Sequence, residues 1–364
     1  MKPIIAVPAT AALVHRAWSR KSLTPAGIIA AALTAIVHAL HPWSAPFALL
    51  VVFYLGGTKA TKIKHDVKAH LTMSATGAAG GEGARTHVQV LANSIVASVL
   101  ILLHTKLLLG RREEEQCFSR GGDVGDLLTV GIVAHYAAVA ADTFASELGI
   151  LSPSKPRLIT SPTLRVVPPG TNGGVTATGL LASLLGAFTI ALTSVVLLPF
   201  CARGWGDRER ILWVLAVTLW GGLGSVVDSF LGGWLQASVV DKRTGKIVEG
   251  SGGQKVLVHP SSTHPSGTPD TATEKQRSSS IGRTEAVANA ATLRGSRITG
   301  TSTGTQPGRD HEHEHESRRV ESGLDLLDNN AVNLLMAALM SVGGMAVASY
   351  VWGVPLGGIW EALA

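Results

Sequence analysis

The sequence is poor in charged residues and in cysteine. Only 15% of its 364 residues are Asp, Glu, Lys or Arg, whereas a soluble globular domain usually carries about 25%. Its two cysteines, Cys117 and Cys201, match neither a disulfide framework nor a metal-binding spacing. The composition therefore excludes an ordinary soluble domain and a cysteine-rich secreted module.

The chain also lacks a concentrated basic region. Its net charge is +6, and the cations are scattered through the polar segments between apolar runs. Scattered loop cations on an apolar chain set its orientation in a membrane, whereas nucleic-acid binding needs a basic patch or stripe. We therefore expect no nucleic-acid partner.

Long apolar runs are what the sequence has instead. They lie at 25–40, 43–57, 88–109, 127–150, 174–200, 211–235 and 331–352. Most approach or exceed the roughly 20 residues that an α-helix needs to cross a bilayer. The sequence thus predicts an all-α, polytopic transmembrane bundle of about seven helices, within a range of six to eight. The two short first runs fit either tilted spans or a re-entrant hairpin.

The N-terminal segment is not fully assigned by this pattern. The N-terminal segment before residue 20 is a further apolar stretch that either spans the membrane or lies along its interface. No convincing cleavage site follows it, so we expect it to be retained.

Residues 259–322 are rich in Ser, Thr, Gly and Pro and have almost no large apolar side chains. We predict a disordered insert there, with 1–258 and 323–364 forming a single transmembrane domain. The HEHEHE tract of the insert is interpreted as a solvated charged segment rather than a metal site.

Alternate threading of the runs divides the loops between two sides. Loops 58–87, 152–173 and 236–330 fall on one side, called side A, and loops 110–126 and 201–210 fall on the other, called side B. The short side-A loops carry the cations Lys59, Lys62, Lys64, Lys68, Arg85, Lys155, Arg157 and Arg165. By the positive-inside rule, side A is the cytoplasmic or stromal face. We favour a multi-pass protein of the endoplasmic reticulum membrane with its motif loops facing the cytosol.

Acidic residues within the apolar runs gather at side A. Asp142, Glu147 and Asp228 lie inside runs, and Asp328 opens the last one. A charge in hydrocarbon costs a few kcal/mol or more, so such a cluster indicates a functional site. Carboxylates are hard oxygen ligands that suit Mg²⁺. The alternatives are a structural polar network between helices and, at Asp328, simple helix capping.

Two side-A segments carry phosphate-binding chemistry. GGTKATKIK offers Lys59, Thr61 and Lys62, although a turn that binds lipid headgroups is an equally good interpretation. VPPGTNGGVT is a Pro-Gly turn that runs into a helix start, where free N–H groups near Gly173 bind anions. The alternative there is an ordinary capped return into the membrane.

These motifs, in their order along the chain, resemble the transmembrane protein 19 family of integral membrane proteins, which includes plant phytyl-phosphate kinase. The strings that carry the resemblance are GTKATKIK, VQVLANS, ADTFASELGILSPSKPRLITSPTLRVVPPGTNGGVT, GSVVDSFLGGWLQASVVDKRTGKIV and LDNNAVNLL. The resemblance implies a membrane enzyme that phosphorylates a prenyl monophosphate with a nucleotide donor and Mg²⁺. The chain departs from the family pattern at GGEGARTHVQV, where GGQRNWVQV is usual.

Residue chemistry and resemblance together predict a prenyl-phosphate kinase. Phosphoryl transfer needs positioning and charge neutralisation more than covalent help from the protein. The expected catalytic residues are Asp142, Glu147, Asp228 and Asp328, with Asp142, Asp228 and Asp328 as the metal ligands. The expected phosphate-binding residues are Lys59, Thr61, Lys62, Asn93, Thr171, Asn172, Gly173, Gly174, Asn329, Asn330 and Asn333. Membrane lipid, an isoprenoid phosphate and a nucleoside triphosphate are the expected partners.

Two other classes remain open. A transporter or lipid carrier would place an intramembrane polar site near the bilayer midplane and open it to both faces in turn. A structural membrane protein without catalytic activity would give no reason for the intramembrane acids.

Overall fold

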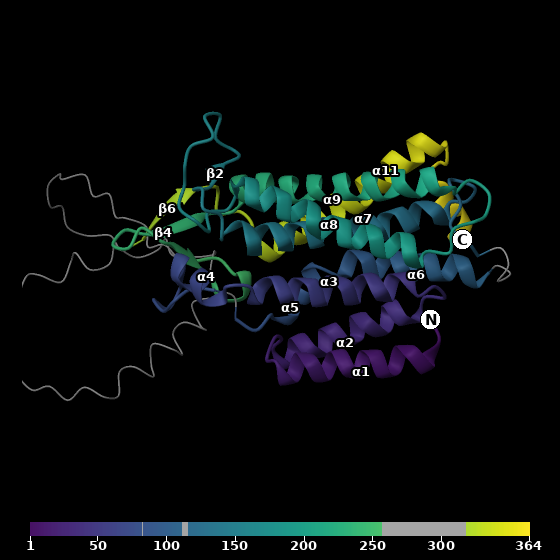
Figure 1. Cartoon of the computed structure of the whole chain (residues 1–364), viewed down its shortest axis with the longest axis horizontal. Coiled ribbons are helices and arrows are strands. Elements are labelled where there is room, and N and C mark those ends of the chain that lie inside the picture. Colours follow the sequence, from purple (N-terminus) through teal and green to yellow (C-terminus); the bar gives the residue numbers. More distant parts are fainter. Residues whose placement is uncertain (82, 111–115, 257–317) are drawn as a thin grey trace, which may run out of the picture. The chain divides into compact units, whose positions relative to one another are not determined.

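The computed structural model describes residues 1–81, 83–110, 116–256 and 318–364, and these belong to one compact unit (Figure 1). The HEHEHE tract and most of the expected insert lie outside the described residues. Arg318–Ser322, however, form a β-strand rather than the end of a disordered insert, which corrects that boundary. The RRVES string of this strand has a single apolar residue, so its composition gave no sign of order.

The predicted helical membrane fold is confirmed. The described helices are α1 Pro3–Ser19, α2 Pro25–Leu40, α3 Ala45–Lys62, α4 His65–Leu71, α5 His87–Ala92, α6 Ile95–Leu109, α7 Gly125–Gly149, α8 Ala177–Leu197, α9 Asp207–Leu235, α11 Asn329–Trp352 and α12 Gly358–Leu363. Of these, α7, α8, α9 and α11 are long and apolar enough to cross a bilayer, and α2 and α6 are shorter apolar helices. The N-terminal segment is helical and packs against α2.

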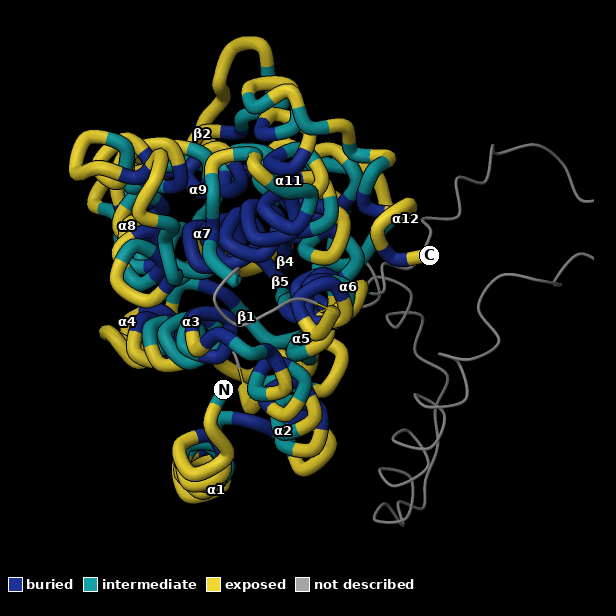
Figure 2. Tube along the Cα trace, turned by 90° about the vertical axis from the view of Figure 1, so that its right-hand side faces the viewer, coloured by how far each residue is buried: buried dark blue, intermediate teal, exposed yellow. Residues whose placement is uncertain are grey.

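Helix α7 is the centre of the bundle, as its dark colour in Figure 2 shows. Every residue from Gly125 to Ala141 is buried. Small residues let the neighbouring helices approach closely: a Cβ on Gly221 would lie 2.7 Å from the Ala137 carbonyl oxygen, and one on Gly186 would lie 2.5 Å from that of Ala140. Small residues at such contacts are the usual basis of helix packing in membranes.

Contacts between loops confirm the predicted alternation. At side A, the Ser22 hydroxyl lies 3.2 Å from the Tyr54 hydroxyl, so the two ends of the α2–α3 pair share one side. At side B, Cys117 and Cys201 form a disulfide across 84 residues. The expectation that these cysteines match no disulfide framework was therefore wrong. Their wide sequence separation hid the pairing, which depends on α6–α7 and α8–α9 turning at the same end of the bundle.

A small sheet ties the side-A loops together. Its strands are β1 Met73–Ser74, β4 Ser238–Asp241, β5 Ile247–Glu249 and β6 Arg318–Ser322, in the order β1-β5-β4-β6. β1 is parallel to β5, and the other pairs are antiparallel. A separate pair joins β2 Arg157–Leu158 to β3 Gly174–Val175. The sheet therefore fixes residues near 73 beside residues near 248, far apart in sequence, at the side-A end.

The predicted helix at 88–109 is broken in two. α5 ends at Ala92 and α6 begins at Ile95, and Asn93 and Ser94 lie between them. The Asn93 carbonyl accepts a 2.9 Å hydrogen bond from His135 Nε2 on α7, which satisfies an acceptor that the break releases. Irregular backbone at membrane depth is tolerated where it is buried in protein or lines a cavity, and Asn93 lines two cavities.

Candidate functional site

A polar cavity of about 310 Å³ lies where the side-A ends of the long helices meet the loop 169–176 and the sheet. Its charged and amide-bearing lining residues are Lys68, Arg85, Gln89, Asn93, Asp142, Glu147, Asn172, Asp228, Gln236, Glu249, Asn329 and Asn333. In Figure 1 the contributing elements converge at the end that carries β4 and β6. Residues predicted from separate helices are thus brought to one place.

Two carboxyl groups meet inside this cavity. Asp142 on α7 and Asp228 on α9 are within hydrogen-bonding reach of each other. Each lies seven residues before the last residue of its helix, which is about 10 Å of helix. Asp228 Oδ1 is buried and has no hydrogen-bond partner among the described residues. Because two ionised carboxylates repel at such a distance, a proton or a cation has to lie between them.

The third expected acid, Glu147, belongs to an ion-pair network. Glu147 Oε2 accepts a 2.6 Å bond from Lys68 Nζ, and Oε1 accepts a 2.5 Å bond from the Thr61 hydroxyl. Lys68 also donates to the carbonyls of Ala60 and Thr61. Arg85 Nη2 donates to Thr61 Oγ1 at 3.0 Å and lies 3.9 Å from Glu147. Glu147 therefore holds two cations in position and has little capacity left for a metal.

The fourth expected acid, Asp328, caps a helix. Its Oδ1 accepts a 2.8 Å bond from the backbone N–H three residues further on, at the start of α11, and Asp328 does not line the cavity. The capping alternative was correct here. Asn330 likewise points elsewhere, since its side-chain amide donates to the Gly252 carbonyl at 3.0 Å. Asn329 and Asn333 do line the cavity.

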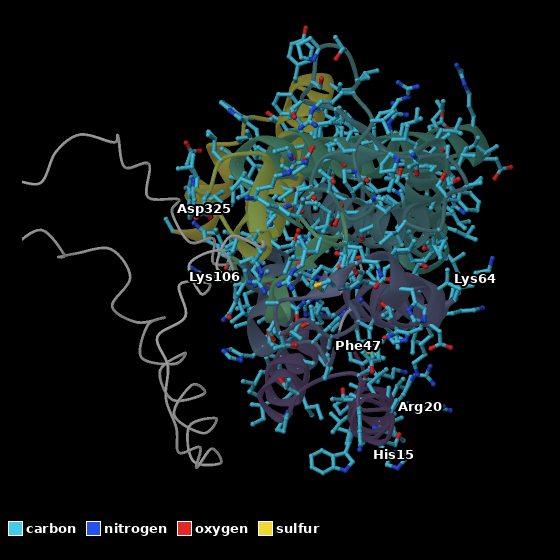
Figure 3. All side chains as sticks on the ribbon, turned by 90° about the vertical axis from the view of Figure 1, so that its left-hand side faces the viewer. His15, Arg20, Phe47, Lys64, Lys106 and Asp325 are labelled. Carbon is cyan, nitrogen blue, oxygen red and sulfur yellow. A yellow bond between two sulfur atoms is a disulfide. The ribbon has the colours of Figure 1, made fainter. Side chains whose placement is uncertain are left out.

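The expected lysines are not at the cavity. Lys59 and Lys62 are exposed, and neither lines it. Figure 3 looks onto side A and shows Lys64 and Arg20 at the margin of the bundle. These exposed cations form a basic rim at side A. The phosphate-binding role predicted for Lys59 and Lys62 gains no support from the cavity, and a turn that binds lipid headgroups remains the alternative. Thr61 contributes only indirectly, through Glu147 and Arg85.

The Pro-Gly loop uses its backbone donors internally. The N–H of Thr171 donates to the Pro168 carbonyl, that of Gly174 donates to the Thr171 carbonyl at 2.9 Å, and that of Asn172 donates to the Ser238 hydroxyl at 2.9 Å. These three donors are not available to an anion. Thr171, Asn172 and Gly174 still line the cavity and shape its wall.

The double glycine of this loop, Gly173 and Gly174, has a packing role. Gly173 has φ +76°, and a Cβ there would lie 2.6 Å from Gly233 Cα, so only glycine lets the loop lie directly on α9. The helix expected to begin at 174 begins at Ala177, with Thr176 as its cap. The double glycine therefore serves close packing and strand β3, and not a helix N-terminus that binds anions.

The lining charges suit a divalent cation. Among the cavity-lining side chains, four are acidic and two are basic, which leaves a formal excess of two negative charges. Magnesium is usually held by one or two carboxylates together with substrate phosphates, rather than by a cage of protein ligands. Asp142 and Asp228 meet that requirement. Within the described part of the chain no three His, Cys, Asp or Glu side chains form a metal cluster, so the expected ligand set loses Asp328.

Five charged or amide-bearing lining residues were missed as site residues: Lys68, Arg85, Gln89, Gln236 and Glu249. Lys68 and Arg85 were counted only as loop cations that set orientation. Lys64 adopts a left-handed conformation with φ +48° between α3 and α4, and this reversal brings Lys68 back onto Glu147. Glu249 reaches the cavity because β5 pairs with β1. Residue spacing in the sequence reveals neither the backbone reversal at Lys64 nor the pairing of β5 with β1.

Comparison with known proteins places the chain among membrane proteins. Residues 8–341 match the family described as integral membrane protein DUF92. Protein PGR of Arabidopsis thaliana is 38% identical over 251 residues, 67% of this chain and 83% of that protein. Uncharacterized membrane protein MJ0933 of Methanocaldococcus jannaschii is 46% identical over 103 residues, 28% of this chain and 38% of that protein. Protein VTE6, chloroplastic, of Arabidopsis thaliana is 28% identical over 169 residues, 46% of each chain. No solved structure matches.

Proposed function

This chain belongs to the integral membrane protein DUF92 family and is a multi-pass membrane protein, and from that premise we propose that it phosphorylates an isoprenoid monophosphate. The observation that carries the proposal is the contact between Asp142 and Asp228 in a cavity that Lys68 and Arg85 also line. Paired acids beside fixed cations are the parts that phosphoryl transfer needs. The resemblance of the motif strings to a family that includes phytyl-phosphate kinase supplies the substrate class.

The proposed reaction joins two anions. An oxygen of the prenyl monophosphate attacks the γ-phosphorus of a nucleoside triphosphate, and a new P–O bond gives the prenyl diphosphate. The bond from that phosphorus to its bridging oxygen breaks, and the nucleoside diphosphate leaves with the electron pair. A phosphate oxygen is already anionic, so the attack needs no general base from the protein. What it needs is neutralisation of repulsion between the reactants.

The residues divide this task. Asp142 and Asp228 would hold Mg²⁺, which supplies positive charge to the transferring phosphoryl group. Arg85 would neutralise and orient the acceptor phosphate, because a guanidinium binds phosphate through paired donors. Glu147 fixes Lys68 and Arg85 rather than touching substrate. Asn333 and Asn172, which also line the cavity, would offer neutral donors to the nucleotide.

The location of the cavity supports a cytosolic or stromal nucleotide source. The basic rim of side A obeys the positive-inside rule. At side B the Cys117–Cys201 disulfide is expected to persist only in an oxidising compartment. Both features favour an orientation in which a water-soluble nucleotide reaches the cavity from side A, with the endoplasmic reticulum as the favoured membrane.

A lipid carrier is the second candidate, since the break between α5 and α6 resembles the discontinuous helices at transporter sites. Purified protein with prenyl monophosphates and ATP, CTP or UTP separates the two. A kinase forms the prenyl diphosphate with at least one donor and loses this activity when Mg²⁺ is chelated. A carrier moves prenyl phosphate across liposomes without forming product. Absence of diphosphate with all three nucleotides would overturn the kinase proposal.

A further inference from the structure

A second cavity adjoins the polar one and differs from it in chemistry. It has a volume of about 90 Å³ and lies between α1, α2, α3 and α5. Most of its wall is apolar, and its lining residues include Leu13, Val14, Ile28, Leu50, Val90 and Phe53. We call it the apolar groove. Two of its four helices, α1 and α2, lie outside all of the motif strings.

The groove is lined at helical spacing on two facing helices. On α1, Leu13, Val14 and Ala17 face it, and on α2, Ala31 and Ala35 face it. Residues three and four apart share one face of a helix, so each helix presents a continuous strip. The strip on α2 consists mainly of alanine, which leaves space between the helices where larger side chains would close it.

The groove and the polar cavity share a junction. Phe53, Arg85, Gln89 and Asn93 line both. Arg85 is anchored there by its bond to the Thr61 hydroxyl, and Asn93 sits at the break between α5 and α6. An apolar groove that meets a guanidinium and then a polar cavity is complementary to an amphiphile with one hydrocarbon chain and an anionic head.

We propose that the apolar groove binds the hydrocarbon chain of a single-chain lipid monophosphate, with its phosphate at Arg85. The inference rests on the proposed function and deepens it, because it assigns the isoprenoid chain to a specific site between α1 and α2 rather than to bulk lipid. It also gives α1 a role, because α1 supplies one wall of that site.

Photolabelling tests this directly and does not require turnover. The probe is a 20-carbon prenyl monophosphate with a diazirine at the end of its chain, added to wild-type protein in detergent. Labelled peptides are identified by mass spectrometry. We expect labels on the groove-lining residues of α1 and α2, such as Leu13, Val14, Ile28 and Ala31. Labels confined to the outward-facing side chains Leu33 and Ile36, which are 59% and 50% exposed, would overturn the proposal.

Substitutions and competitors sharpen the assignment. Ala31→Trp fills the groove, and we expect it to reduce groove labelling about tenfold. Ala26→Trp makes the same change at an exposed position of α2 outside the groove and is expected to label like wild type. The unlabelled 20-carbon prenyl monophosphate is expected to compete, whereas a phosphatidic acid with two acyl chains competes poorly. Equal competition by both lipids would mark a general lipid site and contradict the proposal.

The outcome is separable from that of the kinase assay. If no nucleotide donor supports phosphorylation but the groove is labelled and Ala31→Trp blocks labelling, the kinase proposal fails and the groove assignment holds. If phosphorylation occurs but labelling is unaffected by Ala31→Trp, the groove assignment fails and the kinase proposal holds. The wild-type labelling map decides the matter even where Ala31→Trp does not fold.

Discussion

The two ends of the bundle are held together by different means. At side B, the Cys117–Cys201 disulfide joins two loops, and the rings of Phe118, Trp205 and Trp213 pack against one another beside it. At side A, short strands, hydrogen bonds and ion pairs join the loops around an open polar space. Side B is thus closed by a covalent bond and aromatic packing, whereas the side-A network surrounds a polar cavity. In the proposed function, side B supplies rigidity and side A supplies recognition.

The largest expected effect tests recognition at side A. Asp142→Asn preserves size and removes the carboxylate that lies against Asp228. We expect phosphorylation of a prenyl monophosphate to fall roughly a thousandfold, about 4 kcal/mol, with little change in thermal stability. Single-turnover assays in detergent measure the rate, and thermal unfolding is followed in parallel.

A matched control lies at the other end of the molecule. Asp207 is an exposed acid in the first turn of α9 at side B, and Asp207→Asn is expected to leave the rate unchanged. Wild-type rates in Asp142→Asn would remove Asp142 from the site. Equal losses of phosphorylation rate in Asp142→Asn and Asp207→Asn would mean that catalysis does not depend specifically on side A.

The next effect concerns the ion pairs that shape side A. Lys68 is 6% exposed and gives its hydrogen bonds to Glu147 and to two carbonyls. Lys68→Met removes the nearest cation from the largely buried carboxylate of Glu147, and breaking a fully buried pair typically costs about 3–5 kcal/mol, which is the upper bound here. We expect a clear drop in thermal stability, partly recovered when Glu147→Gln is added. Lys62→Met, at an exposed position of the same segment, is the control and should be close to neutral. No recovery in the double variant would argue against the pairing.

The third prediction addresses rigidity at side B. Cys117→Ser together with Cys201→Ser opens a loop of 84 residues, and removal of a disulfide usually costs roughly 2–4 kcal/mol. We expect a lower unfolding temperature but an unchanged turnover number, because the bond is at the opposite end from the cavity. Unfolding and phosphorylation are measured on the same preparation. A lost turnover number in protein that is still folded would show that side B controls the site.

The smallest effect is a pH dependence in the side-A sheet. Asp241 Oδ1 accepts bonds from the N–H groups of Thr244 and Arg243, each at 2.9 Å, and these hold the pKa of Asp241 below its ordinary value of 3.8. A lowered pKa in the folded state stabilises the protein above that ordinary value, and the contribution is lost as the pH falls through the lowered pKa. Amide exchange in 238–249, corrected for its intrinsic pH dependence, should therefore lose protection only in acid. Asp241→Asn should weaken this pH dependence, and the exposed Asp66→Asn should not.

Local signals in the sequence predicted the helices but not the way their ends meet. The span 25–40 was predicted in full from its apolar run, and the structure shows the Thr24 side chain capping this helix with Pro25 at its start. The break at Asn93 was missed, since VQVLANSIVASVL reads as one apolar run and the break is stabilised by His135 from another helix. Periodicity reports on a single segment, and a bond from a distant helix leaves no trace in it.

The site residues also divide into those that a local sequence signal predicted and those that depend on distant contacts. Asp142 and Asp228 were identified because charge is rare inside apolar runs, which is a local property. The choice between Lys62 and Lys68 was not local: it depends on the reversal of the backbone at Lys64. Asp328 and Glu147 were recognised as unusual, but whether an acid caps a helix, pairs with a lysine or faces a cavity depends on neighbours that only the folded chain supplies.

The burial of α7 bears on how the protein is made. Of the four long spans α7 has the lowest mean hydropathy, 1.5 against 1.7 to 2.2, yet it is the most enclosed. Chains are synthesised from the N-terminus, so α7 enters the membrane before α8, α9 and α11 exist to cover it. Because α7 carries polar groups on several faces, we expect it to stay beside the insertion machinery until its partner helices are made. These partners lie up to about 200 residues downstream in the chain. Ribosome-bound chains that end before α11 should therefore remain associated with that machinery, and completion of α11 should release them.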